Sequence, residues 1–236
     1  MTHMSFRGAS APLEGIFFYQ ILQIKSGESP PMGEQTTTID MRVELLKESV
    51  MNAPVVWKEG YPYFVHPLSD GVPRQTSELL SAARDLVAEN VDWDSIDLIL
   101  GIEAMGIPLA AALCLTSGKP LVIGRKRQYG LPGEVSIDQS TGYSKGEIYL
   151  NDIPKGARVL IVDDVVSTGG TLHPILQAVD RMGAIVQDCW IVFEKGDGMD
   201  KIRTAGDWPL NSSVSYTHLR AHETRHDLVC RLLLEK

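Results

Sequence analysis

The sequence has few of the features that mark secreted, membrane-spanning or nucleic-acid-binding proteins. Its 236 residues include three cysteines, Cys114, Cys189 and Cys230, and their odd number and wide spacing match neither a disulfide framework nor a zinc site. An apolar stretch at 15–24 is too short to cross a bilayer. The net charge of −8 argues against a general nucleic-acid binder. We therefore expect a cytoplasmic protein with no membrane or nucleic-acid partner.

Both ends of the chain differ in character from its middle. Residues 1–40 become rich in Ser, Pro, Gly and Thr, which predicts a disordered or non-native extension. In 211–236, four residues recur at a spacing that formally resembles a metal site: His218, His222, His226 and Cys230. This segment resembles translated non-native sequence, so we predict a non-native tail and no metal site there. The domain is then expected over 41–210.

The most informative stretch is 158–171, which reads R-V-L-I-V-D-D-V-V-S-T-G-G-T. Its apolar run at 159–162 is typical of a strand buried on both faces of a parallel sheet. Helical spacing follows over 172–182. Asp163 and Asp164 are therefore expected where the strand leaves the sheet, and ligands bind at that edge in open α/β folds.

The residues after this acid pair have the composition of a phosphate-binding turn. Gly169 and Gly170 allow successive N–H groups to converge on one point. Hydroxyl donors and a helix N-terminus add to the attraction for an anion. No Lys-Ser/Thr pair follows the glycines, so this is not a Walker A loop. A sugar phosphate whose hydroxyls donate to the acid pair would satisfy both halves; the alternative is an ordinary turn with an Asp N-cap.

Two further strand–loop units precede this motif. A strand over 97–100 leads into a glycine-bounded loop, 101–106, and a helix over 108–115. A third strand, 121–123, ends in Arg125, Lys126 and Arg127, which suit a leaving group whose negative charge grows. The glycine-rich residues after them predict a lid with paired strands at 134–138 and 147–150. A solvated basic turn is the alternative.

The acidic pair followed by S-T-G-G-T resembles the ribose-phosphate signature of the type I phosphoribosyltransferases. Over 41 to about 207 the chain is most similar to archaeal hypoxanthine/guanine members of the adenine phosphoribosyltransferase-like subfamily. The resemblance implies an α/β fold with a doubly wound, mostly parallel sheet and a small N-terminal hood, 41–75. In the hood, a helix at 41–52 precedes an irregular aromatic segment, 53–73, which either covers a flat ligand or only packs.

The resemblance also implies roles for particular residues. Asp163 and Asp164 would hold the ribose hydroxyls, and Arg125 and Lys126 would steady the departing diphosphate. The 5-phosphate would be bound by Val165, Val166, Ser167, Thr168, Gly169, Gly170 and Thr171. The diphosphate would be bound by Glu103, Ala104, Met105, Gly106 and Arg127, often with a non-proline cis peptide in that loop. Lys195, after a strand at 185–193, would donate to O6 and N7 of a 6-oxopurine, unless it is a surface lysine in a turn.

The implied reaction joins hypoxanthine or guanine to 5-phosphoribosyl-1-diphosphate, giving IMP or GMP and diphosphate. Mg²⁺ would be held through the diphosphate with no direct protein ligand, and a homodimer is expected. Two alternatives stay open: an adenine phosphoribosyltransferase making AMP, and a non-catalytic phosphoribosyl-diphosphate sensor. A sensor usually carries a basic DNA-binding module, and 1–40 contains only Arg7 and Lys25.

The chain departs from the family at both familiar proton-handling carboxylates. Ser167 stands where hypoxanthine-guanine enzymes have a third acidic residue, and the position of the lid Glu of adenine enzymes falls near Gly142. Glu134 and Asp138 are substitutes to consider for a general base, which contributes about 10²–10⁴-fold in enzymes. The identity of the base therefore stays open.

Overall fold

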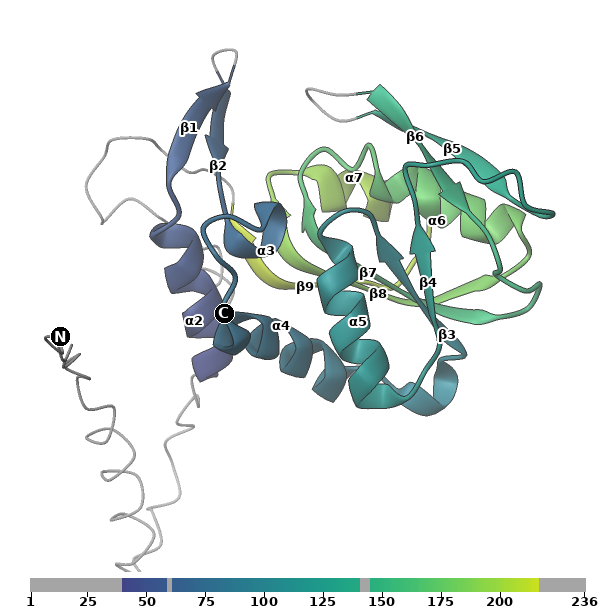
Figure 1. Ribbon diagram of the computed structural model, residues 1–236, viewed down its shortest axis with the longest axis horizontal. Helices are drawn as coiled ribbons and strands as arrows, with labels where there is room; N and C mark the ends of the chain where they lie inside the picture. The colour runs from purple at the N-terminus through teal and green to yellow at the C-terminus, as the bar shows by residue number, and fades with distance from the viewer. Residues whose placement is uncertain (1–39, 59–60, 141–144, 217–236) are drawn as a thin grey trace, which may run out of the picture. The chain divides into compact units, whose positions relative to one another are not determined.

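A parallel sheet forms the centre of the computed structural model, which describes residues 40–58, 61–140 and 145–216 (Figure 1). The strand order is β4-β3-β7-β8-β9, and every neighbouring pair is parallel. The strands are β3 (Leu98–Ile102), β4 (Leu121–Gly124), β7 (Arg158–Val166), β8 (Ile185–Lys195) and β9 (Leu210–Tyr216). The α/β class with a mostly parallel sheet, expected from the sequence, is confirmed.

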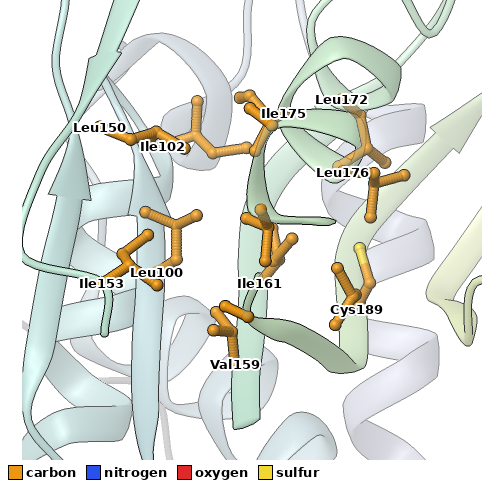
Figure 2. Packing of buried hydrophobic residues seen from close by; sticks show 14 of the residues in the cluster. Leu100, Ile102, Leu150, Ile153, Val159, Ile161, Leu172, Ile175, Leu176 and Cys189 are labelled. Atoms are coloured by element: carbon orange, nitrogen blue, oxygen red, sulfur yellow. The ribbon is translucent and has the colours of Figure 1, made fainter. Parts of the chain in front are cut away.

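Helices cover both faces of this sheet, so successive strand residues enter different cores. In β3, Leu98, Leu100 and Ile102 face one core, whereas Ile99 faces the other. Figure 2 shows part of the first core, where Leu100 and Ile161 of the sheet lie near Ile175 of a covering helix. The helices are α4 (Ser77–Asn90), α5 (Gly106–Ser117), α6 (Leu172–Arg181) and α7 (Gly198–Ala205). Burial on both faces explains the continuous apolar runs of the sequence.

An N-terminal hood precedes the sheet. It consists of α2 (Met41–Met51), β1 (Val55–Lys58), β2 (Tyr61–Phe64) and α3 (Pro67–Asp70). The expectation of an irregular segment over 53–73 is wrong in part, because β1 and β2 pair antiparallel with Val55 opposite Phe64. β-branched and aromatic residues favour such strands. Pro67 then opens α3 at a position where helices tolerate proline.

The predicted lid strands are present as an antiparallel hairpin, β5 (Val135–Ser140) and β6 (Lys145–Leu150). Asp138 lies opposite Glu147 in its register. Ile137 and Ile148 enter the same core as α6, so one face of the hairpin is anchored to the body of the molecule.

The sheet continues past the boundary that the sequence placed after residue 210. β9 pairs with β8 from Leu210 to Tyr216, and Tyr216 is buried. The sheet therefore includes residues 211–216 of the predicted tail, and the prediction that 211–236 is non-native stays a prediction. The polar sequence of β9, L-N-S-S-V-S-Y, carries a weak strand signal, and pairing with β8 supplies the order. Residues 1–39 and 217–236, with the four residues of the metal-like spacing, lie outside the described residues.

No helix in the described part of the chain is long and apolar enough to cross a membrane.

Candidate active site

The strand order creates a switch point between β3 and β7. The chain runs from β3 outward to β4 and then returns to the other side of β3 to form β7. The loops after β3 and β7 therefore leave the same edge in opposite directions and open a crevice, which is the general ligand position in such sheets. Both loops singled out in the sequence are at this crevice: the β3 loop (103–106) and the β7 turn (167–171).

The acid pair, Asp163 and Asp164, lies inside β7 rather than beyond its end. The strand runs on to Val166, so Val165 and Val166 are strand residues and only 167–171 form the turn. Two polar residues in an apolar run concealed this extension from the sequence pattern. The Asp164 N–H donates to Asp163 Oδ1 at 3.0 Å.

Burial leaves the acid pair short of compensating charge. The two residues are 8% and 9% exposed. Burial raises the pKa of Asp163 to about 6, although nearby Lys126 opposes this rise. Burial and the charge of Asp163 raise the pKa of Asp164 well above its usual range. Such carboxyls bind hydroxyl donors or cations strongly, because either relieves the cost of the buried charge.

The β7 turn has the backbone geometry of an anion site. Gly169 has φ +80°, which glycine adopts at no steric cost. Thr171 ends the turn as the N-cap of α6, and its side chain makes no capping hydrogen bond to that helix. In the first turn of α6 the His173 N–H donates to the Gly169 carbonyl at 3.0 Å and Pro174 has no N–H, so the Leu172 N–H is the one that this helix start can offer to an anion.

A second helix fixes the shape of the turn. A Cβ added to Gly198, the first residue of α7, would lie 2.3 Å from the Ser167 carbonyl oxygen and 2.8 Å from the Gly169 nitrogen. No side chain fits there, so the start of α7 and the β7 turn are in direct backbone contact. The sequence gives no local signal for this contact, because the two segments are about 30 residues apart.

The β3 loop lies directly against the acid pair. A Cβ added to Gly106 would lie 2.8 Å from Asp163 Oδ1. The peptide bond between Glu103 and Ala104 is cis, as the resemblance implied. Glu103 Oε2 accepts a hydrogen bond from the Lys126 N–H at 2.9 Å, which joins this loop to the basic segment after β4. Met105 faces the hood, close to Gly71.

The three cations after β4 are all exposed, and they differ in what they contact. Lys126 is the cation whose charge acts on Asp163. Arg125 pairs its backbone with Tyr149 of β6. Arg127 lies over the ring of Tyr129, 5.5 Å from its centroid. Of the three cations, Lys126 is therefore the one whose charge reaches Asp163, and Arg127 contacts a residue of its own loop.

The lid carboxylates have structural partners. Glu134 accepts hydrogen bonds from the Tyr129 and Gly130 N–H groups, each at 3.0 Å. Its side chain thus closes the turn over 129–134, which follows the three cations in the chain. Asp138 is exposed on β5, opposite Glu147. These contacts hold Glu134 and Asp138 within the lid, and neither contact brings its carboxylate to the acid pair.

Lys195 meets the hood at the end of β8. Its ammonium lies 5.7 Å from the ring centroid of Phe64, a cation–π distance. Phe64 also packs edge-on against Tyr216, the last residue of β9. The aromatic hood segment is therefore positioned over this edge of the sheet, although the sequence alone singled out no ring in it.

The hood helix α3 is fixed by His66, which the sequence analysis also missed. His66 is fully buried, and its Nδ1 accepts from the Leu68 N–H at 3.1 Å. Because Nδ1 accepts, Nε2 carries the proton and donates to Ser49 Oγ at 2.9 Å. Burial lowers the pKa of His66 to about 4, so the ring is neutral. The Ser69 hydroxyl, on the same helix, is buried and has no hydrogen-bond partner in the described part of the chain.

Comparison with known proteins agrees with this geometry. Residues 75–208 match the phosphoribosyl transferase domain. A hypoxanthine/guanine phosphoribosyltransferase of Methanohalophilus mahii is 51% identical over 164 residues, covering 70% of this chain and 86% of the relative. One of Ferroglobus placidus is 51% identical over 161 residues, covering 68% and 86%.

Solved structures share the same architecture. Adenine phosphoribosyltransferase from Rhodothermus marinus superposes with a TM-score of 0.60 at 25% identity, covering 74% of this chain and 98% of that one. The domain match spans more than half of the chain and includes both loops of the crevice. The chain therefore belongs to the phosphoribosyl transferase family.

Proposed function

We propose that this protein is a purine-salvage enzyme that makes IMP or GMP and diphosphate from hypoxanthine or guanine and 5-phosphoribosyl-1-diphosphate. The observation that carries the proposal is the buried acid pair between two loops at the switch point of the sheet. The names of the relatives at 51% identity support the choice of base. Lys195 supports it too, because an ammonium donates to O6 and N7 of a 6-oxopurine.

The donor would lie across the crevice. Its 5-phosphate would bind the β7 turn, next to the start of α6, where backbone N–H groups and the hydroxyls of Ser167, Thr168 and Thr171 are available as donors. Its ribose hydroxyls would donate to Asp163 and Asp164 and so satisfy the buried carboxylates. The acid pair would then hold the anomeric carbon still while an oxocarbenium-like charge develops there.

The leaving diphosphate would lie on the β3 loop, with Arg125, Lys126 and Arg127 beside it. Cations already in place before the reaction starts raise the rate by about 10²–10³-fold per group. The carboxylate oxygens of the acid pair suit Mg²⁺, and no group of three or more His, Cys, Asp or Glu suited to a metal lies in the described ranges. Mg²⁺ would be held through the diphosphate, whose charge it would neutralise.

A turnover assay tests the proposal. Hypoxanthine, guanine and adenine are each supplied with the donor, with and without Mg²⁺, and diphosphate release is measured. We expect Mg²⁺-dependent release with hypoxanthine or guanine. Release with adenine alone would instead assign an AMP-forming enzyme, and donor binding without release would assign a sensor. The variant Asp163→Asn/Asp164→Asn should lose donor binding; binding at the wild-type level would refute the site.

A cytoplasmic homodimer completes the proposal. Cys114 and Cys189 are free thiols, which suits a reducing compartment. Light scattering on the purified protein tests the dimer, which is expected because members of this family are commonly dimers.

A further inference from the structure

Gln139 breaks the apolar pattern of the lid hairpin. Alternate residues of a strand share a face, and Val135 and Ile137 of β5 both face the core under α6. Gln139 is next on this face and is partly buried. A polar side chain on a core-facing position needs a partner.

That partner is the last residue of the β7 turn. Gln139 Nε2 donates to Thr171 Oγ1 at 2.7 Å, across 32 residues of sequence. The bond joins the hairpin to the turn that, on the proposed function, receives the 5-phosphate.

The bond also decides where the Thr171 hydroxyl can point its proton. A hydroxyl has one proton and two lone pairs, and the glutamine amide occupies a lone pair. Thr171 does not cap α6, and no acceptor for its proton is found within the described ranges. The proton is therefore left to donate to a ligand in the turn.

We propose that Gln139 is a positioning residue for the sugar-phosphate donor: it orients the Thr171 hydroxyl toward the 5-phosphate. The inference rests on the proposed function, because it requires the phosphate at the β7 turn. It assigns the hairpin a part in holding the 5-phosphate, at the end of the donor opposite to the diphosphate.

The test compares two ligands that occupy different halves of the donor site. Binding of ribose 5-phosphate and of inorganic pyrophosphate is measured calorimetrically on the full-length protein. The variants are Gln139→Leu, Gln139→Glu, Thr171→Val and the double variant Gln139→Leu/Thr171→Val. Ser136→Ala, at an exposed position of the same strand, is the matched control.

Gln139→Leu should weaken ribose 5-phosphate binding about 5–10-fold, the effect of one hydrogen bond, and leave pyrophosphate binding within about twofold. Gln139→Glu should weaken it more than tenfold, because a carboxylate accepts the hydroxyl proton and repels the phosphate. The double variant should match Thr171→Val alone, because Gln139 acts through that hydroxyl. Ser136→Ala should bind both ligands as the wild type does.

Three results would overturn the inference: wild-type affinity in Gln139→Leu or Gln139→Glu, equal losses for both ligands, or additive effects in the double variant. If the wild-type protein turns over purines and binds ribose 5-phosphate, these results refute the role of Gln139 and leave the proposed function intact. A wild-type protein that binds no ribose 5-phosphate refutes the phosphate site and the role of Gln139 together.

Discussion

At the scale of single residues, the buried acid pair lowers the free energy of unfolding of the ligand-free protein near neutral pH. Folding raises the pKa of Asp163 to about 6 and raises that of Asp164 well above its usual range, so the folded state binds protons more tightly than the unfolded chain. The free energy of unfolding contributed by the pair is therefore highest at low pH and falls as pH rises from about 4 through 6 and above. In the proposed function, hydroxyls of the bound donor would offset this cost by donating to the carboxylates.

Replacing Asp164 with Asn should separate these two effects. The neutral amide removes the buried charge, so Asp164→Asn should unfold at a higher temperature than the wild type at pH 8, by about 2–4 °C. Turnover should fall at least about 100-fold. Thermal unfolding from pH 5 to 8 and the diphosphate assay measure the two effects.

Asp97→Asn is the matched control, because the Arg158 partner lowers the pKa of Asp97 to about 2. This control should gain no stability at pH 8. A lower unfolding temperature for Asp164→Asn than for the wild type would contradict the account of the acid pair.

His66 gives the opposite pH dependence. Its pKa falls from 6.5 to about 4 on folding, so the unfolded chain binds the proton more tightly. The contribution is complete above pH 6.5 and is lost as pH falls toward 4, a loss of about 3 kcal/mol.

In His66→Asn this loss should disappear. The Asn oxygen can still cap α3, and no group titrates there. The difference in unfolding free energy between the wild type and His66→Asn should therefore narrow steadily from pH 7 to 4.5. A difference independent of pH would show that the ring does not titrate in this window.

At the scale of elements, the contact between α7 and the β7 turn should be indispensable. The methyl group in Gly198→Ala would lie 2.3 Å from a backbone oxygen, and backbone cannot give way as a flexible side chain can. The KM for the donor should rise at least about tenfold, because the turn must move by several tenths of an ångström or more.

Gly146→Ala serves as the comparison, because its added methyl group would approach Gln139 Oε1 no closer than 3.9 Å. This variant should keep the wild-type KM. A normal KM in Gly198→Ala would mean that the turn is not the phosphate site or is not held by α7.

The sequence was sufficient to predict the helices and strands that a local residue pattern encodes. Apolar runs and helical spacing located the strands and helices around the crevice. The end of β7 was misplaced because Asp163 and Asp164 interrupt its pattern, and β9 was missed because polar residues dominate it. The contacts made by Gln139 and Gly198 join distant segments, and no local pattern encodes them.

At the scale of the whole molecule, the site combines parts of different stability. β7 has a hydrogen-bonded strand on each side, whereas β5–β6 and β1–β2 are two-stranded. Two-stranded hairpins are marginal alone, so they should open locally while the sheet stays intact.

Amide hydrogen exchange should resolve this difference. Amides of β7 should exchange only through global unfolding, with the free energy found by denaturant titration. Amides of the two hairpins should exchange faster, and ribose 5-phosphate should slow exchange in β5 through Gln139. Equal exchange rates in β7 and the hairpins would contradict this hierarchy.

The position of the acid pair on the central strand has a consequence for how this protein can diverge. Substitutions in the hood and the hairpin affect parts that can open locally, so base preference and lid behaviour can change in evolution without destabilising the sheet. The acid pair, which we propose holds the sugar, cannot change in this way, because any substitution that shifts β7 disturbs both cores at once. Relatives with other bases should therefore differ at the periphery and share the centre.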